Sequence, residues 1–498
     1  MPLYGITASH PKRRDQDCGK SSSAGDAEVV DLTGSVGGIC DCETEQVKSL
    51  ATRGGSNPIE LEWRCARNDL ELNRVSLSKK RCYSADPQDA RERAPRKRES
   101  TMRPLITTDS HWAPPIELAN ELPERFREFV PHLERRSDGD YLVQPSFLSK
   151  VQDQNALMSM MQSAGRKVLP GEAEPMLMGG HGSARPSSYP KQRLLEMERD
   201  GVVAEVLIGP EGFGFHMPAD ADLAWCRLIN DWLAEHYKDH LHRFAPSIQL
   251  PINAGMEAVV KELARAAALG LRPAVLPDCL PENPYYKAEW EPLWEAAAAL
   301  KVPISLHIAF GHTEKRHMDI WPGMTQTSLM WSSAAQNETI SWFVFGGILE
   351  RHPDLKIVLT EGSAGWLAWL MEYMDYAYAG RFTQSAGPLQ MLGGQLKLKE
   401  LPSFYVKRQV ACTFMFDPVA VKMRHTTGLD SLMWGNDYPH AEGVFPNSQE
   451  MVAQQFAGVP DAEIDQMVFG NAARIFGLAP FADTGAVRSP NGEKVAVS

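Results

Sequence analysis

The chain has 498 residues and a formal net charge of −12, with 43% hydrophobic and 23% charged residues and a mean hydropathy of −0.31. These values lie close to the average of globular proteins and exclude a fibrous chain. The longest apolar stretches, such as Ile340–Leu349, are too short for a helix that crosses about 30 Å of hydrocarbon. We therefore expect no membrane partner, and the length allows a large buried core.

The first 101 residues differ from the rest of the chain. They carry 17 Lys and Arg against 16 Asp and Glu, are rich in Ser, Gly, Arg and Asp, and show no sustained strand or helix period. Such a segment cannot bury enough apolar surface to become ordered, so we predict a disordered extension over residues 1–101. Its basic run Arg91–Arg98 is interpreted as a solvated linker rather than a localisation signal. Met102 follows directly, and alternative initiation or a misassigned start codon would explain the extension. A disordered tail is predicted over residues 481–498.

The remaining residues, 102–498, carry 34 Lys and Arg against 47 Asp and Glu. This acidity disfavours a nucleic-acid partner, because phosphate binding needs a basic face. Charges near the N-terminus precede any apolar signal region, so a cytoplasmic location is expected. The eight cysteines have no paired C-x-x-C spacing and are expected to stay reduced. A small-molecule substrate is expected, and self-association into a homo-oligomer is left open.

From residue 102 onward, short β-rich runs alternate with amphipathic helical stretches, the order that specifies a parallel sheet covered by helices. The eight predicted strands are Leu105–Thr108, Val202–Ile208, Ser247–Leu250, Ala274–Leu276, Pro303–Ile308, Leu355–Thr360, Gln409–Thr413 and Ser431–Trp434. The predicted helices include Asp220–His240, Met256–Leu269, Tyr286–Leu300, Ser363–Tyr378 and Pro418–His425.

Eight such units predict an α/β fold, a (β/α)₈ TIM-like barrel of the metal-dependent hydrolase type over residues 102–480. An open doubly wound sheet is the alternative, but no G-x-G-x-x-G follows the first strand. In a barrel, the chemistry lies at the C-terminal ends of the strands.

Five polar residues fall at these strand ends. Asp109 and His111 follow the first strand, His307 lies near the end of the fifth, Glu361 ends the sixth, and Asp437 follows the eighth. A lone histidine at a strand end is more often a core or surface residue, but the coincidence of several at one rim weakens that interpretation.

The types and spacing of these residues predict a metal site. In Asp109-Ser110-His111, the i, i+2 spacing on an extended segment places both side chains on one face. With His307 and Asp437 they offer two nitrogens and two oxygens. This set suits one divalent cation, Zn²⁺ first and Mn²⁺ or Fe²⁺ next, better than Ca²⁺.

The sequence resembles the amidohydrolase-related family (amidohydrolase 2), in the branch similar to aminocarboxymuconate-semialdehyde decarboxylase. The matching segments are TTDSHWAPP, RLLEMERDGVVAEVLIGP, PISLHIAFG, FGGILERHPDLKIVLTEGSAGWL, MWGNDYPH and VFGNAARIFGL. The resemblance implies a metal-dependent barrel with Asp109, His111, His307 and Asp437 at ligand positions, and Asp437 doubling as a proton carrier. The chain departs from the wider superfamily at Asp109, where the usual pair is His-x-His, and at Glu361, where a His is common.

Glu361 and His440 are the further catalytic candidates. Three carboxylates around one divalent cation would push one carboxyl toward its neutral form, so one of them can act as a general acid. For Glu361, a role as a second acceptor that orients a ligand is equally open. His440 either positions the substrate or simply partners Asp437.

Several other histidines and aromatic residues can be explained by ordinary structural roles as well as by functional ones. His312 and His317 are interpreted as loop residues, with contact between His312 and the substrate left open. His181 lies in a Gly-rich loop that either closes over the site or has no such role, and His352 is interpreted as a helix-end residue. The four aromatics beside the motifs indicate either a flat aromatic substrate or ordinary packing. They are Trp112, Phe310, Trp321 and Trp366.

Two reactions fit the same ligands. In hydrolysis, the metal lowers the pKa of a bound water, Asp437 accepts its proton, and the hydroxide attacks a carbonyl. In non-oxidative decarboxylation, the metal chelates a carboxylate and an acid protonates the ring carbon. Hydrolysis is preferred at this stage because decarboxylation also needs a cation to hold the carboxylate, and only Lys315 and Arg316 adjoin the rim motifs. A catalytically inactive binding module would need a broken ligand set, and the set is intact.

A shortened chain that starts at Met102 should be as stable and as active as the full chain, because residues 1–101 have no pattern that forms a core. Thermal unfolding and turnover of the two proteins would check this. Limited proteolysis that leaves residues 1–101 intact would contradict it.

Overall fold

The computed structural model of the protein describes residues 102–143, 166–167, 188–209, 217–278, 280, 283–308, 324–379, 397–440 and 443–481. The predictions for residues 1–101 and for 482–498 concern parts of the chain outside these ranges. The same holds for several residues weighed above. They are His181, Phe310, His312, Lys315, Arg316, His317 and Trp321.

All eight predicted barrel strands are present, and their residues are almost wholly buried. The first is longer than predicted and includes His111, because its last residues still pair with the neighbouring strand. The strands are β1 (Leu105–His111), β5 (Val202–Ile208), β6 (Phe244–Pro246) with β7 (Ile248–Gln249), β8 (Ala274–Pro277), β9 (Ile304–His307), β10 (Ile357–Thr360), β11 (Val410–Phe414) and β12 (Leu432–Trp434).

The third strand is divided at Ser247 and changes partners there. Its first half, β6, pairs in parallel with β5, and its second half, β7, pairs in parallel with β8. The prediction missed Phe244–Pro246, where the sequence signal for a strand is weak because proline has no N–H for the ladder. Through this divided strand the order β1-β5-β6 continues into β7-β8-β9-β10-β11-β12.

The sheet closes where β12 meets β1. Ser110 bridges in parallel to Tyr438, the Asp437 N–H donates to the Asp109 carbonyl at 2.9 Å, and the His111 N–H donates to the Tyr438 carbonyl at 2.5 Å. The predicted (β/α)₈ barrel is therefore confirmed, with its seam next to the polar residues of β1.

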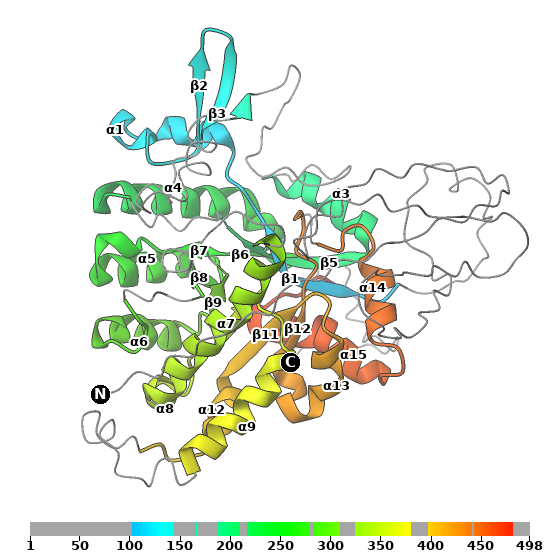
Figure 1. Ribbon diagram of the computed structural model, residues 1–498. Coiled ribbons are helices and arrows are strands. Elements are labelled where there is room, and N and C mark those ends of the chain that lie inside the picture. The colour runs from blue at the N-terminus through cyan, green and yellow to red at the C-terminus, as the bar shows by residue number, and fades with distance from the viewer. Residues whose placement is uncertain are drawn as a thin grey trace, which may run out of the picture. The chain divides into compact units, whose positions relative to one another are not determined.

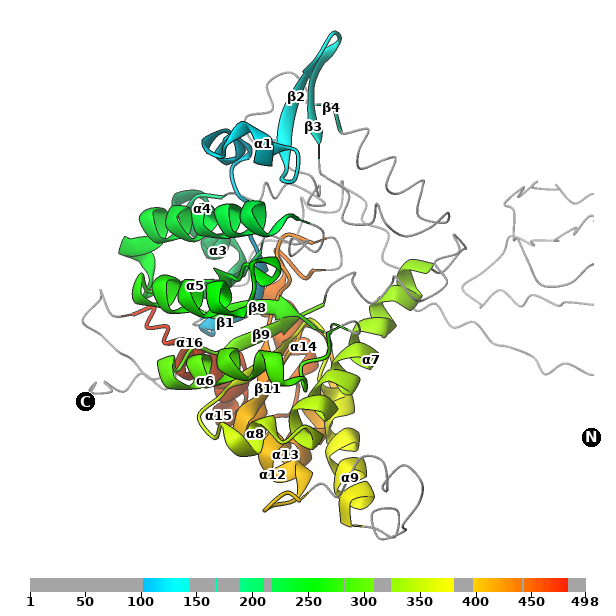
Figure 2. The same cartoon turned by 90° about the vertical axis from the view of Figure 1, so that its left-hand side faces the viewer.

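Helices cover the outside of the barrel (Figures 1 and 2), and α4, α5 and α6 lie one beside another along the strands. No helix in the described part of the chain is long and apolar enough to span a membrane. From α3 onward, the α-helices of the described residues are α3 (Pro190–Asp200), α4 (Ala219–Tyr237), α5 (Met256–Ala268), α6 (Glu291–Leu300), α7 (Met324–Phe345), α8 (Ile348–Arg351), α9 (Gly365–Ala379), α12 (Pro402–Gln409), α13 (Pro418–Thr427), α14 (Ser448–Gln455), α15 (Asp461–Asp465) and α16 (Asn471–Phe476).

The five predicted helices all form. The helix predicted from Tyr286 begins later, at Glu291, with Pro292 in its first turn and a short 3₁₀ segment before it. Proline is favoured at such a position because the first N–H groups of a helix have no partner within the helix.

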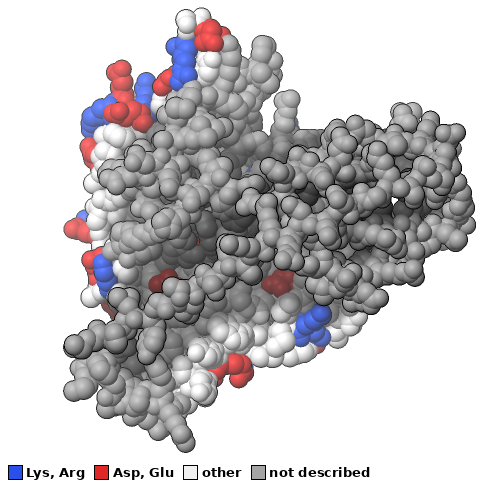
Figure 3. Space-filling view, viewed as in Figure 1, with Lys and Arg blue, Asp and Glu red and all other residues white. Residues whose placement is uncertain are grey.

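A small antiparallel sheet, which the sequence analysis did not predict, follows β1 and the short helix α1 (Glu124–Arg127). It consists of β2 (His132–Arg136), β3 (Gly139–Val143) and β4 (Arg166–Lys167). Acidic and basic side chains lie next to each other on this hairpin (Figure 3), as in the ion pair of Arg135 with Asp140 at 3.1 Å. Its half-exposed polar surface explains why the strand period was weak in the sequence.

The buried apolar residues form two clusters, one on each side of the barrel wall. One cluster lines the interior and includes Ile106, Ala204 and Ile208; the other packs against the helices and includes Leu105 and Leu207. Alternate residues of each strand thus face opposite sides, as expected for a barrel.

A one-residue bulge interrupts this alternation in β1. Thr107 pairs with Glu205 and Ser110 with Leu207, so three steps along β1 match two steps along β5. Without the extra residue, Ser110 would follow Ile106 into the interior; with it, Asp109 and His111 face the interior instead.

Gly435, directly after β12, lies so close to β1 that no side chain fits. A Cβ atom at this position would lie 2.7 Å from the Asp109 Cβ and 3.0 Å from the Thr413 Cγ2. The close approach of the last strand to the first therefore depends on glycine.

Gly435→Ala should lower the free energy of unfolding by about 1–3 kcal/mol, since the added methyl group overpacks the seam. Chemical denaturation would measure the loss. Gly470→Ala is the control, because its Cβ would meet nothing closer than the Asp465 carbonyl oxygen at 3.7 Å. Equal stability of the two variants would contradict the close packing of the seam.

Candidate metal centre

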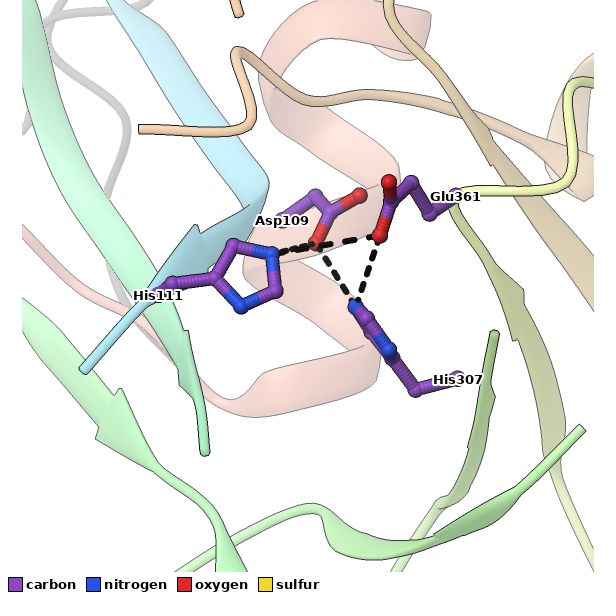
Figure 4. A group of neighbouring side chains, drawn as sticks. All are labelled: Asp109, His111, His307 and Glu361. Carbon is purple, nitrogen blue, oxygen red and sulfur yellow. Dashed lines mark ion pairs between the residues drawn. The ribbon is translucent and has the colours of Figure 1, made fainter. Parts of the chain in front are cut away.

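Six ionisable side chains meet inside the C-terminal rim of the barrel. Every residue that the sequence analysis named as a ligand or catalytic group is among them, and the part of the chain that the structure describes adds no further member. They are Asp109, His111, His307, Glu361, Asp437 and His440. Figure 4 shows four of them, with the polar atoms of Asp109 and His111 pointing toward those of His307 and Glu361.

The histidine nitrogens lie between the carboxylates. His307 Nε2 is 3.5 Å from Asp109 Oδ1 and 3.1 Å from Glu361 Oε2. His111 Nε2 is 3.5 Å from the same Asp109 oxygen and 2.9 Å from Asp437 Oδ1. The ligand atoms of Asp109, His111, His307 and Glu361 lie within 4.8 Å of one another, and so do those of His111, Glu361, Asp437 and His440.

These atoms converge without forming ordinary hydrogen bonds. Asp109 Oδ1, His307 Nε2 and both Asp437 carboxylate oxygens are buried and have no hydrogen-bond partner of good geometry among the described residues. Buried polar atoms are normally satisfied, so a group of such atoms aimed at one region suggests an ion that shares them. The donor set, with imidazole nitrogens and carboxylate oxygens, fits a divalent cation such as Zn²⁺, Mn²⁺ or Fe²⁺.

The orientation of His307 is fixed from behind. Its Nδ1 lies 2.8 Å from the Ile308 carbonyl oxygen, which favours a proton on Nδ1 and leaves Nε2 as the atom that faces the carboxylates. This is the arrangement that a neutral histidine ligand needs.

The backbone is strained at two of the carboxylates. Glu361 has φ 63° and Asp437 has φ 55°, in the left-handed region that side-chain-bearing residues rarely adopt. Each strand turns sharply just after it ends, and the turn directs the carboxylate back over the barrel mouth. Strain of this kind persists only where surrounding contacts enforce it, and it is concentrated at functional sites.

The charges of the cluster shift the pKa values of its members. Burial, together with the nearby Asp437 carboxylate, raises the pKa of Glu361 to about 7. For His307, burial alone would lower the pKa, but Asp109 and Glu361 outweigh it and raise the pKa to about 10. Burial would likewise raise the pKa of Asp109, yet the adjacent His111 and His307 hold that pKa well below its ordinary value. The cluster therefore favours added positive charge, whether from protons or from a cation.

His440 contacts both a carboxylate and a second histidine. Its Nδ1 is 3.0 Å from Asp437 Oδ1, and its ring stacks on that of His111 with centroids 3.9 Å apart. Its side chain is 12% exposed, whereas that of Asp437 is 2% exposed. His440 thus lies on the outer side of the cluster, within ion-pair distance of Asp437.

Two of the aromatics weighed as substrate contacts belong to the packing of the barrel. Trp112 is buried, packs against Trp232 with the two rings tilted, and donates from its indole nitrogen to the Ser188 carbonyl. Trp366 donates in the same way to the Gly362 carbonyl. His352, expected at a helix end, follows α8 and pairs with a carboxylate of α6.

The sequence analysis missed a buried ion pair behind β1, between Arg193 of α3 and Glu205 of β5. Both lie within one of the family-like segments, but neither was given a role. A signal was present: Arg193 shares the buried face of α3 with Met197, and Glu205 stands alone in the apolar strand VVAEVLI. Opposite charges at two buried positions on adjacent elements predict a pair.

The comparisons with known proteins agree with this architecture. Residues 178–478, more than half of the chain, match the family model described as amidohydrolase. A search of curated proteins found no match. The matched range includes His307, Glu361 and Asp437 and begins after the first strand.

Solved structures share the fold at low sequence identity. An amidohydrolase from Mycobacterium avium subsp. paratuberculosis K-10 is 16% identical with a TM-score of 0.57, covering 76% of this chain and 98% of that one. The 2,6-dihydroxybenzoate decarboxylase from Rhizobium is 16% identical with a TM-score of 0.50 and coverages of 76% and 99%.

A third structure is the 5-carboxyvanillate decarboxylase from Novosphingobium aromaticivorans DSM 12444, with bound manganese and 3-methoxy-4-hydroxy-5-nitrobenzoic acid. It is 15% identical with a TM-score of 0.51 and coverages of 76% and 97%. At such identities the likeness establishes the fold and not the activity. The family match over more than half of the sequence, with the barrel that these structures share, shows that this chain belongs to the amidohydrolase family.

Proposed function

We propose that the protein is a metal-dependent, non-oxidative decarboxylase of an aromatic or unsaturated carboxylic acid. The observation that carries the metal-dependent part is the convergence of buried atoms of Asp109, His307 and Asp437 that have no ordinary hydrogen-bond partners among the described residues. The choice of reaction is supported by two structures of the same fold that are named as decarboxylases of aromatic acids.

The proposed ligands are Asp109, His111, His307 and Asp437, around one divalent cation. Glu361 also lies within reach, but its side chain is 14% exposed, against 3% for Asp109 and 2% for Asp437. The more exposed carboxyl faces the side from which a substrate enters. We therefore assign Glu361 to the substrate and the two most buried carboxylates to the cation.

A bound divalent cation would supply the positive charge that holds a carboxylate with an adjacent oxygen and that stabilises negative charge as it develops. Zn²⁺ and Mn²⁺ are the first candidates, and Fe²⁺ fits the same donors. According to the sequence analysis, decarboxylation also needs a cationic side chain that holds the substrate carboxylate. The two candidates that it named, Lys315 and Arg316, lie outside the described residues.

The protein side chains then handle the proton. The bond between the carboxylate and the ring carbon breaks, and carbon dioxide leaves. The two electrons of that bond remain on the ring carbon, which then takes a proton. Asp437 and Glu361 are the carboxyls placed to deliver that proton, and His440, stacked on His111, is placed to position the substrate.

Hydrolysis, the reaction preferred from the sequence, is the second candidate. The buried Asp437 carboxylate, with neither oxygen hydrogen-bonded in good geometry, also suits a base that accepts a proton from an attacking water. The products separate the two reactions: hydrolysis adds an oxygen from solvent to the product, and decarboxylation does not.

His307→Ala and Asp109→Ala should each lose bound metal and nearly all turnover, because removing one of few ligands loosens the ion and admits water. Metal analysis of the purified variants would measure this. His352→Ala is the matched control, since that histidine pairs with Glu291 on the outside of the barrel and should keep full metal content. Stoichiometric metal in both site variants would refute the ligand assignment.

Asp437→Asn should keep part of the metal yet lose about 10²- to 10⁴-fold in kcat, because the amide offers an oxygen but cannot carry a proton. A screen of aromatic acids, amides and lactones first identifies a substrate. Turnover in ¹⁸O-labelled water then compares wild type with the variant. Carbon dioxide with unlabelled product supports decarboxylation, label in the product moves the assignment to hydrolysis, and an Asn variant at wild-type rate refutes the proton role of Asp437 in both.

A further inference from the structure

Arg193 of α3 is a fully buried cation that the proposed reaction does not use. Its side chain is 0% exposed, and it lies on the outer side of β1, opposite the face that carries Asp109 and His111. Removing a charge from water costs free energy, so a buried arginine is stable only where its hydrogen bonds and ion pairs offset that cost.

The three guanidinium nitrogens bind three different groups. Nε donates to Glu205 Oε2 at 2.8 Å, Nη2 donates to Ser110 Oγ at 2.7 Å, and Nη1 donates to the His111 carbonyl at 2.9 Å. Ser110 and His111 are the second and third residues of the metal-binding tripeptide. Arg193 therefore binds that tripeptide on the outer face of β1 and links it to Glu205 of β5.

The same guanidinium also contacts the segment that follows the last strand, β12. It lies over the ring of Tyr438, 5.2 Å from the centroid, and Tyr438 directly follows Asp437. The Tyr438 carbonyl accepts the His111 N–H at 2.5 Å, and the Ser110 hydroxyl lies 3.5 Å from it. One side chain thus contacts the two segments that carry Asp109, His111 and Asp437.

The segments that Arg193 holds are those with the least intrinsic preference for their conformation. β1 contains the bulge between Thr107 and Ser110, and Asp437 has a left-handed backbone. Neither feature is stable without enforcing contacts. A metal site tolerates displacements of only about 0.5 Å, so the spacing of its ligands depends on what holds them.

We propose that Arg193 is a positioning residue, which sets the distance between the ligands of the first strand and Asp437 through Ser110, the His111 carbonyl and Tyr438. This inference rests on the proposed metal site. Glu205 serves as the counter-charge that keeps the guanidinium in place, and Ser110 is the contact through which its position reaches the bulge.

Two variants test the proposal with little disturbance of folding. Arg193→Lys keeps the positive charge beside Glu205 but cannot donate in three fixed directions, and Ser110→Ala removes one acceptor without leaving a buried charge unpaired. Arg243→Lys is the matched control. Arg243 likewise donates to β5, in its case to the Val203 carbonyl near the end of the strand that lies away from the proposed metal site.

The measurements are the dissociation constants of Mn²⁺ and of Zn²⁺ for the full chain, the visible spectrum of the Co²⁺-loaded protein, and the unfolding temperature of the metal-free protein. We expect both site variants to bind metal about 10- to 100-fold more weakly, with an altered Co²⁺ spectrum and turnover restored by excess metal. The metal-free unfolding temperatures of Ser110→Ala and wild type should agree closely.

The outcomes separate this inference from the metal site itself. If wild type takes up no metal, the proposed function fails, and the role of Arg193 fails with it. If wild type binds metal, His307→Ala does not, and both site variants keep the wild-type affinity and spectrum, only the role of Arg193 is overturned. A loss of affinity that Arg243→Lys shares, in proportion to lowered stability, would show a merely structural effect and overturn it as well.

Discussion

Three carboxylates that lie within a few ångströms of one another, two of them buried and one half-buried, form the constraint on which the site depends. Asp109, Glu361 and Asp437 face the same region, and two buried histidines stand between them. Like charges in a confined, poorly solvated space raise each other's free energy, so the arrangement needs positive charge from protons or from a metal ion. The raised pKa values of His307 and Glu361 show that both groups hold a proton more tightly than they would in water.

The barrel provides a rigid frame for this arrangement. Parallel strands end at one rim, so residues far apart in sequence come together there without long connecting loops. The seam between β12 and β1 is held by Thr107, whose hydroxyl lies 2.9 Å from the side-chain oxygen of Asn436, and Asn436 in turn donates to Asp200 at 2.9 Å. These contacts, with Gly435 against β1, hold the segment in which Asp437 keeps its left-handed backbone.

The proposed chemistry, a metal-assisted reaction at a carbonyl or carboxylate, rests on membership of the amidohydrolase family and on the cluster of candidate ligands. The two reactions considered differ in whether a water or a ring carbon exchanges a proton with the protein. The same carboxyls serve either purpose, because both reactions require a proton carrier next to developing charge. The identity of the substrate depends on the groups that line the mouth of the barrel beyond the cluster.

Much of this protein could be predicted from the sequence. Alternating apolar runs located the eight strands, because burial on both faces of a parallel sheet leaves a strong local signal. The cluster could be predicted from the residues at the strand ends, since Asp109, His111, His307 and Asp437 are recognisable by type and position. The sequence also predicted a metal site that suits transition-metal ions. It could not locate the divided third strand or the hairpin β2–β3, where proline and exposed polar residues weaken the pattern.

The direction in which the candidate ligands point was decided by tertiary structure. The i, i+2 spacing places Asp109 and His111 on one face, but whether that face is the interior depends on the bulge between Thr107 and Ser110, which exists only as a mismatch with β5. The same is true of Arg193 and Glu205, whose pairing joins two elements and bonds to a third. Local sequence determines which residues form a strand and alternate along it. Register, closure of the sheet and buried ion pairs are relations between strands, and these form only when the barrel is assembled.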